Sequence, residues 1–350
     1  TLRQTIDAYA QSGGAGVVLG APCPGGLHHW VSLECDDGGV LTGVWARGDC
    51  ARPRFAGVAI APTARLRQYF ERNPGIMENT GVGSMPPVEG DLAFSFELMR
   101  RDGIETRCVI ARDFVVDVDR PWDIVEANKQ ALRYAIASVS ENRIDPDARI
   151  HDGAEIAADA RLIAQAGAQV GKGCIIQGSA ILMNGAQVRH GAILGPEVSI
   201  GHRARIEEYA KIHAESVLGD DSVLSHCAEF SGITFDVVLM CHYCCVSALI
   251  GTHVDIGAAT VCGTWRFDDG VRQQRVHGHS ETPLWHGNLS YIGDYARTGV
   301  NATFMPGVKV GCYCCVGPGV IVSEDVPEQK MVLAAQRQIQ KEWGPERYGW

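Results

Sequence analysis

The sequence predicts two folds in one chain: an α/β domain followed by a parallel β-helix of six-residue repeats. The main observation is a strict period between Val170 and Phe230, where every sixth residue is large and apolar. A second observation is that this period is absent before about residue 143, where expected strands and helices alternate. A period of six matches neither a helix nor a simple strand alternation. It fits a triangular prism of short parallel strands.

Before the repeats, short apolar runs predict strands, and capped or amphipathic runs predict helices. The expected strands are 16–20, 30–35, 40–46, 55–60, 104–110 and 114–118, and the expected helices are 2–9, 63–71, 90–101 and 121–138, with a Gly/Pro-rich loop at 81–88. Asp119 is the expected N-cap of the last helix, because Pro121 suits its first turn. This alternation predicts an α/β domain over residues 1–143.

The segment from Asp117 to Asn128 (DVDRPWDIVEAN) resembles the end of the nucleotidyltransferase domain in sugar-1-phosphate nucleotidylyltransferases. The resemblance covers residues 1 to about 140, but only as the second half of that domain. It implies that Asp117 helps to bind the catalytic Mg²⁺, a role that suits a carboxylate. Asp117 can also be read as a helix-capping acid.

The first half of that domain has no counterpart in the sequence. The family opens with a Gly-rich loop ending in Gly-Thr-Arg and a Pro-Lys pair, whereas Gly13–Gly16 is the only Gly cluster near the start and is best read as a turn. Val44–Arg47 stands where the family has its Glu-Lys-Pro motif. We expect the missing half to be encoded upstream of Thr1; a decayed transferase site is the alternative.

The repeats extend over residues 144–326 and predict about eight coils. The period starts weakly at Ile150, Ile156 and Leu162, slips by two residues before Val170, and slips by two again after Phe230. An inserted loop at 263–291 interrupts it, and residues 327–350 form a C-terminal tail. If the repeats carry a site, we expect it between the slip after Phe230 and the loop, against a neighbouring protomer.

Motifs beyond the bare period resemble the C-terminal half of bifunctional sugar-phosphate nucleotidylyltransferase/N-acetyltransferases, especially the archaeal type. They are Ile256–Thr260, Trp265–Asp268, Ile292–Asn301 and Met305–Val308. The resemblance implies a left-handed parallel β-helix, a homotrimer with sites between protomers, and acetyl-CoA as acyl donor.

In that family a histidine acts as general base on the sugar amine, a role that suits a group titrating near neutrality. His226 and His242 are the two candidates, since His226 has the family's spacing from Leu218-Gly219 and His242 lies one residue short of the spacing to Ile250-Gly251. The surrounding residues depart from the family pattern at both positions, so either histidine can instead be a corner residue bonded to backbone. Candidate phosphate-binding residues are Arg266, Arg272, Arg275, Arg297 and Asn301; for the loop arginines, pairing with loop aspartates is the alternative.

Cysteines cluster at Cys241–Cys245 and Cys312–Cys315. Such spacing occurs in zinc sites. However, Cys244 and Cys262 occupy large core positions of the repeat, and Cys174 and Cys314 occupy small ones, so packing is the favoured interpretation.

The composition limits the classes of function. A formal net charge of −10 argues against broad nucleic-acid or anionic-membrane binding. No apolar run approaches the length of a membrane span. Thirteen cysteines with no secretion signal predict reduced thiols and a cytoplasmic protein.

Three hypotheses follow. The first is a transferase that forms nucleotide sugars from a nucleoside triphosphate and a sugar phosphate with Mg²⁺. The second is acetyl-CoA-dependent N-acetylation of an amino-sugar phosphate in the β-helix. The third is a trimerising or regulatory subunit with reduced activity.

Overall fold

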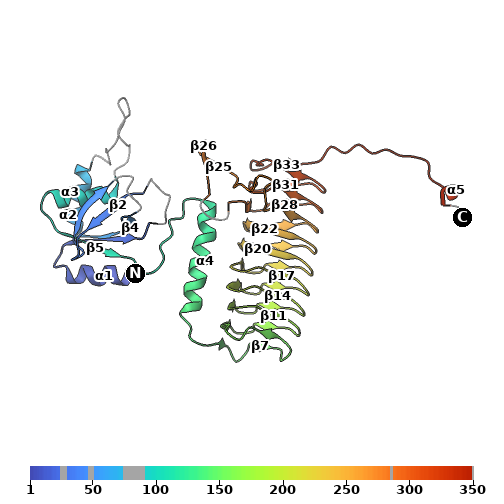
Figure 1. Cartoon of the computed structure of the whole chain (residues 1–350), viewed down its shortest axis with the longest axis horizontal. Helices are drawn as coiled ribbons and strands as arrows, with labels where there is room; N and C mark the ends of the chain where they lie inside the picture. The colour runs from blue at the N-terminus through green and yellow to red at the C-terminus, as the bar shows by residue number, and fades with distance from the viewer. Residues whose placement is uncertain (24–29, 46–50, 74–90, 284–286, 349–350) are drawn as a thin grey trace. The chain divides into compact units, whose positions relative to one another are not determined.

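A computed structural model describes residues 1–23, 30–45, 51–73, 91–283 and 287–348 of the 350-residue chain. The chain divides into two compact units, Thr1–Asp117 and Val118–Trp350. The predicted order, an α/β unit followed by a parallel β-helix, is confirmed (Figure 1). Among the described residues, no helix is both long enough and apolar enough to cross a membrane.

The first unit is a five-stranded sheet with helices on it. The strands follow the order β3-β2-β4-β1-β5. Only β1 and β5 are parallel neighbours. Its elements are α1 (Leu2–Gln11), β1 (Gly16–Ala21), β2 (Ser32–Cys35), β3 (Leu41–Trp45), β4 (Arg54–Ile60), α2 (Thr63–Arg72), α3 (Leu92–Arg101) and β5 (Thr106–Ile110). Helices α2 and α3 bury Tyr69, Phe96 and Met99 against one face of the sheet.

Two local predictions for the part of the chain before the repeats are wrong, and a third cannot be assessed. The strand expected at 114–118 does not form, and the carbonyl of Val115 instead accepts a hydrogen bond from the buried Arg54 guanidinium at 2.6 Å. The N-cap of the helix α4 (Pro121–Ala137) is Arg120 and not Asp119, with the Asp123 carboxylate accepting from the Arg120 amide at 2.9 Å. The loop expected at 81–88 lies outside the described residues.

The second unit is a β-helix whose short strands form three faces. Face 1 is a sheet of ten strands, one from each coil, so the estimate of about eight coils was too low. Its strands are β7 (Arg149–Ile150), β10 (Gln169–Val170), β13 (Gln187–Val188), β16 (Arg205–Ile206), β19 (Val223–Leu224), β21 (Leu239–Met240), β23 (Asp255–Ile256), β28 (Arg297–Thr298), β31 (Cys315–Val316) and β33 (Met331–Val332).

Faces 2 and 3 join into one sheet because β20 (Glu229–Thr234) and β22 (Cys245–Ile250) run through both. The other strands of face 2 are β8 (Glu155–Ile156), β11 (Ile175–Ile176), β14 (Ile193–Leu194), β17 (Lys211–Ile212), β24 (Val261–Cys262), β29 (Thr303–Phe304) and β32 (Ile321–Val322). Those of face 3 are β6 (Arg143–Ile144), β9 (Leu162–Ala164), β12 (Ala180–Leu182), β15 (Val198–Ile200), β18 (Val217–Leu218), β27 (Ser290–Ile292) and β30 (Lys309–Val310).

The six-residue period places its large residues in the interior, as predicted. The eleven residues of the run are at most 3% exposed and form one continuous core: Val170, Ile176, Leu182, Val188, Leu194, Ile200, Ile206, Ile212, Leu218, Leu224 and Phe230. The expected position of Leu162 was wrong by two residues, because Ala164 is the residue that pairs with Leu182. Leu162 pairs with Ala180 and is nevertheless fully buried.

Helix α4 packs lengthwise on face 3 and belongs with the β-helix (Figure 1). The contact division therefore falls at Asp117, whereas the sequence analysis drew the boundary at 143. At one end Trp122 and Val125 pack on Leu249 and Tyr291, and the Trp122 and Tyr291 rings meet edge to face at 6.4 Å. At the other end Leu132 and Ile136 pack on Ile181.

Past residue 262 the chain leaves the coils and returns at β27. The loop carries a two-stranded hairpin of β25 (Gln274–Val276) and β26 (His279–Glu281). Beyond the expected end of the repeats at 326, β33 adds a further strand to face 1. The last described helix is α5 (Pro345–Tyr348).

Candidate functional site

Changes in coil length occur at one of the three corners of the β-helix. The turns from face 1 to face 2, and those from face 3 to face 1, each contain four residues in coil after coil. The turn from face 2 to face 3 varies in length. It has five residues in the first coil (157–161) and three or four in the next coils. It is absent where β20 and β22 run straight through, and it is replaced by 27 residues at 263–289. We call this edge the irregular corner. Both slips of the period and the inserted loop fall on it.

The two-residue shift in the period after Phe230 corresponds to a missing turn in the structure. In β20 and β22 the backbone continues straight across the irregular corner, and all six residue pairs from Glu229–Cys245 to Thr234–Ile250 keep their register. Gly232 makes this possible, because it has φ of +125° and a Cβ there would overlap the Ala248 carbonyl oxygen. An L-residue with a side chain is disfavoured on both grounds.

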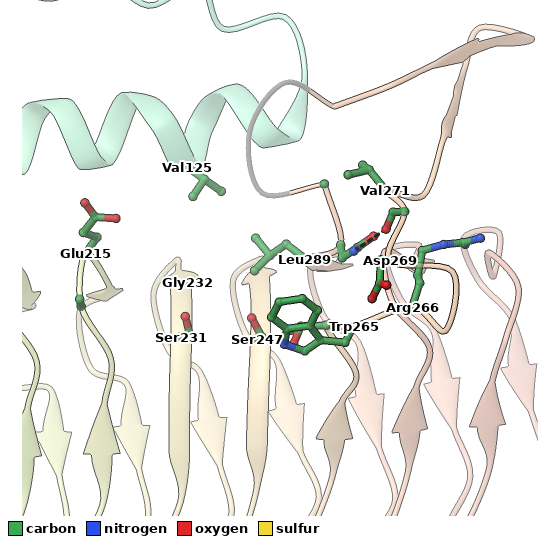
Figure 2. Close-up of a pocket in the computed structure, with 15 residues that line it drawn as sticks. Val125, Glu215, Ser231, Gly232, Ser247, Trp265, Arg266, Asp269, Val271 and Leu289 are labelled. Atoms are coloured by element: carbon green, nitrogen blue, oxygen red, sulfur yellow. Dashed lines mark hydrogen bonds between the residues drawn. The ribbon is translucent and has the colours of Figure 1, made fainter.

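A pocket of about 470 Å³ lies over the straightened strands. Figure 2 shows Ser231 and Ser247 side by side on β20 and β22, with the Trp265 indole beside Ser247 and Val125 of α4 facing them. Leu289 and the loop residues before Val271 complete the wall. Most of the lining thus comes from the stretch between the slip after Phe230 and the end of the inserted loop, and Val125, Ala214 and Glu215 come from outside it.

Charged side chains fix the rim of this pocket. Glu215 pairs with Lys129 of α4 at 2.7 Å and also with Arg133, which reaches Glu197 at 2.8 Å. On the loop side, Arg266 makes two hydrogen bonds to the Asp268 carboxylate, at 2.8 and 2.6 Å. These bonds lower the pKa of Asp268 to about 2. The rim thus holds paired charges, while the floor offers serine hydroxyls.

The two candidate histidines lie together, on a different corner from the pocket. His226 and His242 occupy the same position in successive turns from face 1 to face 2, and their rings stack with centroids 5.1 Å apart. The Tyr243 ring meets both edge-on, at 5.5 and 5.1 Å. Both histidines are exposed, and neither lines the pocket. We call this edge the histidine corner.

The candidate phosphate-binding residues are dispersed. Only Arg266 lines the pocket. Arg272 is engaged by Asp325 and the Ser323 carbonyl, each at 3.2 Å. Arg275 is exposed on β25, and Arg297 is exposed on β28 of face 1. Asn301 takes a left-handed turn conformation (φ 56°) at the histidine corner.

Asp117 ends the first unit as an exposed residue. Its carboxylate acts electrostatically on Arg54, which is 3% exposed and whose guanidinium lies 3.9 Å from the centroid of the Trp30 ring. Burial lowers the pKa of Arg54, and Asp117 opposes that shift. An exposed carboxylate fits Mg²⁺, which commonly takes one or two carboxylates together with substrate phosphates.

The cysteines at core positions are packed. Cys174, Cys244, Cys262 and Cys314 are buried, and the Cys244 thiol donates to the Cys241 carbonyl at 2.6 Å. Over the described part of the chain, no group of three or more His, Cys, Asp or Glu side chains is arranged to hold a metal ion.

Sequence reasoning missed the outer wall of the pocket. Helix α4 covers a column of outward residues on face 3 that are apolar in six coils and interrupted by Ser199: Ile163, Ile181, Val217, Ile233, Leu249 and Tyr291. The signal was present as a second apolar position in those six coils. The stronger inward period of six masks it in the sequence.

Comparison with known proteins confirms the resemblance. A bifunctional sugar-1-phosphate nucleotidylyltransferase/acetyltransferase of Sulfurisphaera tokodaii is 26% identical over 238 residues, which is 68% of this chain and 53% of that protein. Bifunctional GlmU proteins of Methanocaldococcus jannaschii (31% identity; 62% of this chain, 47% of that protein) and Methanococcus vannielii (27%; 64% and 48%) are also similar. The chain is thus similar in sequence to bifunctional proteins of sugar-nucleotide synthesis.

The particular proteins that it resembles are these bifunctional enzymes, and the chain spans about half the length of each. No protein-family model matches it. Solved structures of LpxA from Acinetobacter baumannii (15% identity; 54% of this chain, 70% of that chain) and Bacteroides fragilis (18%; 53% and 70%) align with TM-scores of 0.27 and 0.28. At these scores the superposition carries no structural argument.

Proposed function

We propose that the chain is part of a transferase that forms nucleotide sugars, with its first unit contributing to nucleotidyl transfer. A sugar-phosphate oxygen would attack the α-phosphorus of a nucleoside triphosphate. The new P–O bond would form as the bond to the β-phosphate breaks, and pyrophosphate would leave. The exposed carboxylate of Asp117, at the position that the family motif gives to its metal ligand, carries this proposal.

Asp117 would hold the Mg²⁺, which supplies charge neutralisation to the phosphates. Arg54 acts as a positioning residue, because its hydrogen bond to the Val115 carbonyl fixes the backbone two residues before Asp117. The reaction requires alignment and charge stabilisation more than covalent participation by the protein.

The test is pyrophosphate release by the full product of the gene, with each nucleoside triphosphate against a panel of sugar 1-phosphates. Asp117→Asn should lower kcat by about a hundredfold or more, as expected when a charge-stabilising group is lost. Asp119→Asn removes a neighbouring exposed carboxylate and should leave kcat unchanged. Absence of pyrophosphate release with every pair, or equal loss in both variants, would refute the proposal.

We infer a second candidate activity, acyl transfer to an amino sugar, from the pocket at the irregular corner. Its serine hydroxyls, Trp265 and the paired Arg266 suit a polar, ring-shaped acceptor. The acceptor amine would attack the thioester carbonyl of acetyl-CoA. The amide C–N bond would form and the C–S bond would break, the amine proton would pass to a histidine, and CoA would leave as a thiolate that takes this proton from the imidazolium.

The separation of pocket and histidines makes this candidate depend on assembly. One protomer presents the pocket on the irregular corner and His226 and His242 on the histidine corner, at opposite edges of face 2. A site that uses both must combine two protomers, which supports the expected homotrimer.

Thiol release from acetyl-CoA with hexosamine phosphates tests this activity. The double variant His226→Ala/His242→Ala should lower kcat by about a hundredfold or more, within the usual contribution of a general base. His213→Ala, which removes a partly exposed histidine paired with Glu229, is the matched control. An unchanged rate in the double variant, or a monomer by light scattering, would refute the assignment.

A further inference from the structure

A second hollow lies on face 1 at the other end of the β-helix, away from the irregular corner. Its volume is about 500 Å³, and it spans the first coils around β7, β10 and β13. We call it the basic groove. The side chains that define its charge are Arg149, His151, Lys172, Arg189, His190 and Glu208.

The groove concentrates positive charge in a protein whose net charge is −10. Three permanent cations line it, against one carboxylate. Within the described part of the chain, Arg149 and Lys172 form no salt bridge. Arg189 lies 3.9 Å from both Glu207 and Glu208, at the limit of an ion pair and beyond hydrogen-bond reach. All three cations therefore keep donors free.

Strand register brings these cations together. Arg149 lies opposite Gln169, which lies opposite Gln187, so three successive coils contribute to one surface. Parallel strands are about 4.8 Å apart, which spreads the cations over roughly 10 Å. Gly171 also lines the groove, and a Cβ there would come within 3.3 Å of the backbone of Arg189 and His190 on the next coil.

We propose that the basic groove binds a small anion with two adjacent phosphate groups, of the pyrophosphate or nucleoside diphosphate class. Two guanidinium groups and an ammonium group across about 10 Å match such a pair of phosphates better than a single one. Gln169 and Gln187 add neutral amide donors on the same surface. This site is separate from the pocket and from Asp117, so it stands without either proposed activity.

Isothermal titration calorimetry with pyrophosphate, and separately with a nucleoside diphosphate, tests the proposal on the intact protein. Arg149→Ala and Lys172→Ala should each weaken binding about tenfold, the usual effect of losing a charge-assisted hydrogen bond. The double variant should show no binding at about 1 mM, a concentration that still detects weak complexes. Higher salt should weaken wild-type binding, because exposed charges are screened.

Arg203→Ala is the matched control, because it removes one exposed arginine, paired with Asp221, from a different corner. It should leave the affinity unchanged. The proposal is overturned if wild-type protein binds neither ligand, or if the groove variants bind as tightly as Arg203→Ala while retaining wild-type thermal unfolding. A third outcome would also overturn the proposal: wild type binds neither anion, and the double variant breaks up an oligomer of the wild-type protein. The groove would then be filled by a second copy of the chain.

Discussion

The histidine corner and the irregular corner belong to the same coils, yet they differ in how they tolerate change. Every turn at the histidine corner has four residues, from 151–154 to 317–320. Its later turns repeat a left-handed residue, as at Tyr209, Tyr243 and Asn301. At the irregular corner the turn lengthens, disappears and becomes a 27-residue loop. Two corners of constant length keep the coils in register, so the third can vary.

The irregular corner is also the edge that lies beside helix α4. Helix α4 packs on face 3 directly beside it, where Trp122, Val125 and Leu289 belong to one apolar cluster and Val125 and Leu289 line the pocket. Loss of the turn therefore creates a pocket with walls, where otherwise it would expose apolar surface. The same six-residue repeat thus forms the regular coils and, where a turn is lost, the floor of the pocket.

The largest expected effect comes from Phe230, where the last regular coil meets the first straight strand. Its side chain is fully buried in the continuous core. Phe230→Ala should lower the free energy of unfolding by about 3–5 kcal/mol, because a large cavity is left between stacked coils. Urea unfolding measures this loss.

Phe230→Leu is the conservative control and should cost less than about 2 kcal/mol. If both variants lose equal stability, shape at the junction matters more than buried volume. The distinction between regular and straight coils would then extend into the core.

A smaller effect should separate two glycines. Gly232→Ala should cost about 2–4 kcal/mol, because it adds a Cβ that overlaps the Ala248 carbonyl and forces an L-residue to φ +125°. Gly173→Ala at the histidine corner should cost only about 1 kcal/mol, since its φ is +71° and the nearest atom would be 4.0 Å away. Urea unfolding of both variants tests this, and equal costs would contradict the account of the straight strand.

The residues that fill the interior of the β-helix could be predicted from the sequence, whereas the arrangement of its surface could not. Inward residues follow a period, because each coil must fill the same triangle, so Val170 to Phe230 could be placed by counting. The slips at Leu162 and Phe230 were visible, but their common location was not, since assigning them to one corner requires the strand register. Ser231 and Ser247 carry no signal of their own; they become a site only where Gly232 keeps the strand straight.

The histidines show the same limit. Their spacing made His226 and His242 alternative candidates for one role, and the structure stacks their rings. No spacing rule shows which edge of the prism a turn occupies, so the separation of His226 and His242 from the pocket could not be foreseen. Helix α4 was predicted as a helix, but the surface that it covers depends on outward apolar residues on face 3, which Ser199 interrupts.

The smallest expected effect is on the reactivity of cysteine thiols in and next to the coils that contain β20 and β22. It tests whether reagents in solvent can reach the interior of these coils. Burial raises the pKa of Cys244 to about 12 and that of Cys262 to about 11. Their stabilising effect is present below the ordinary thiol pKa near 8.5 and is lost as pH rises toward the folded values. At pH 8 iodoacetamide should alkylate exposed Cys227 in the native protein and leave Cys244 and Cys262 unmodified by mass spectrometry. In urea all three should react. If Cys244 in the native protein is alkylated as fast as Cys227, the loss of a turn opens the interior of the β-helix. Variation at the irregular corner would then disturb the core.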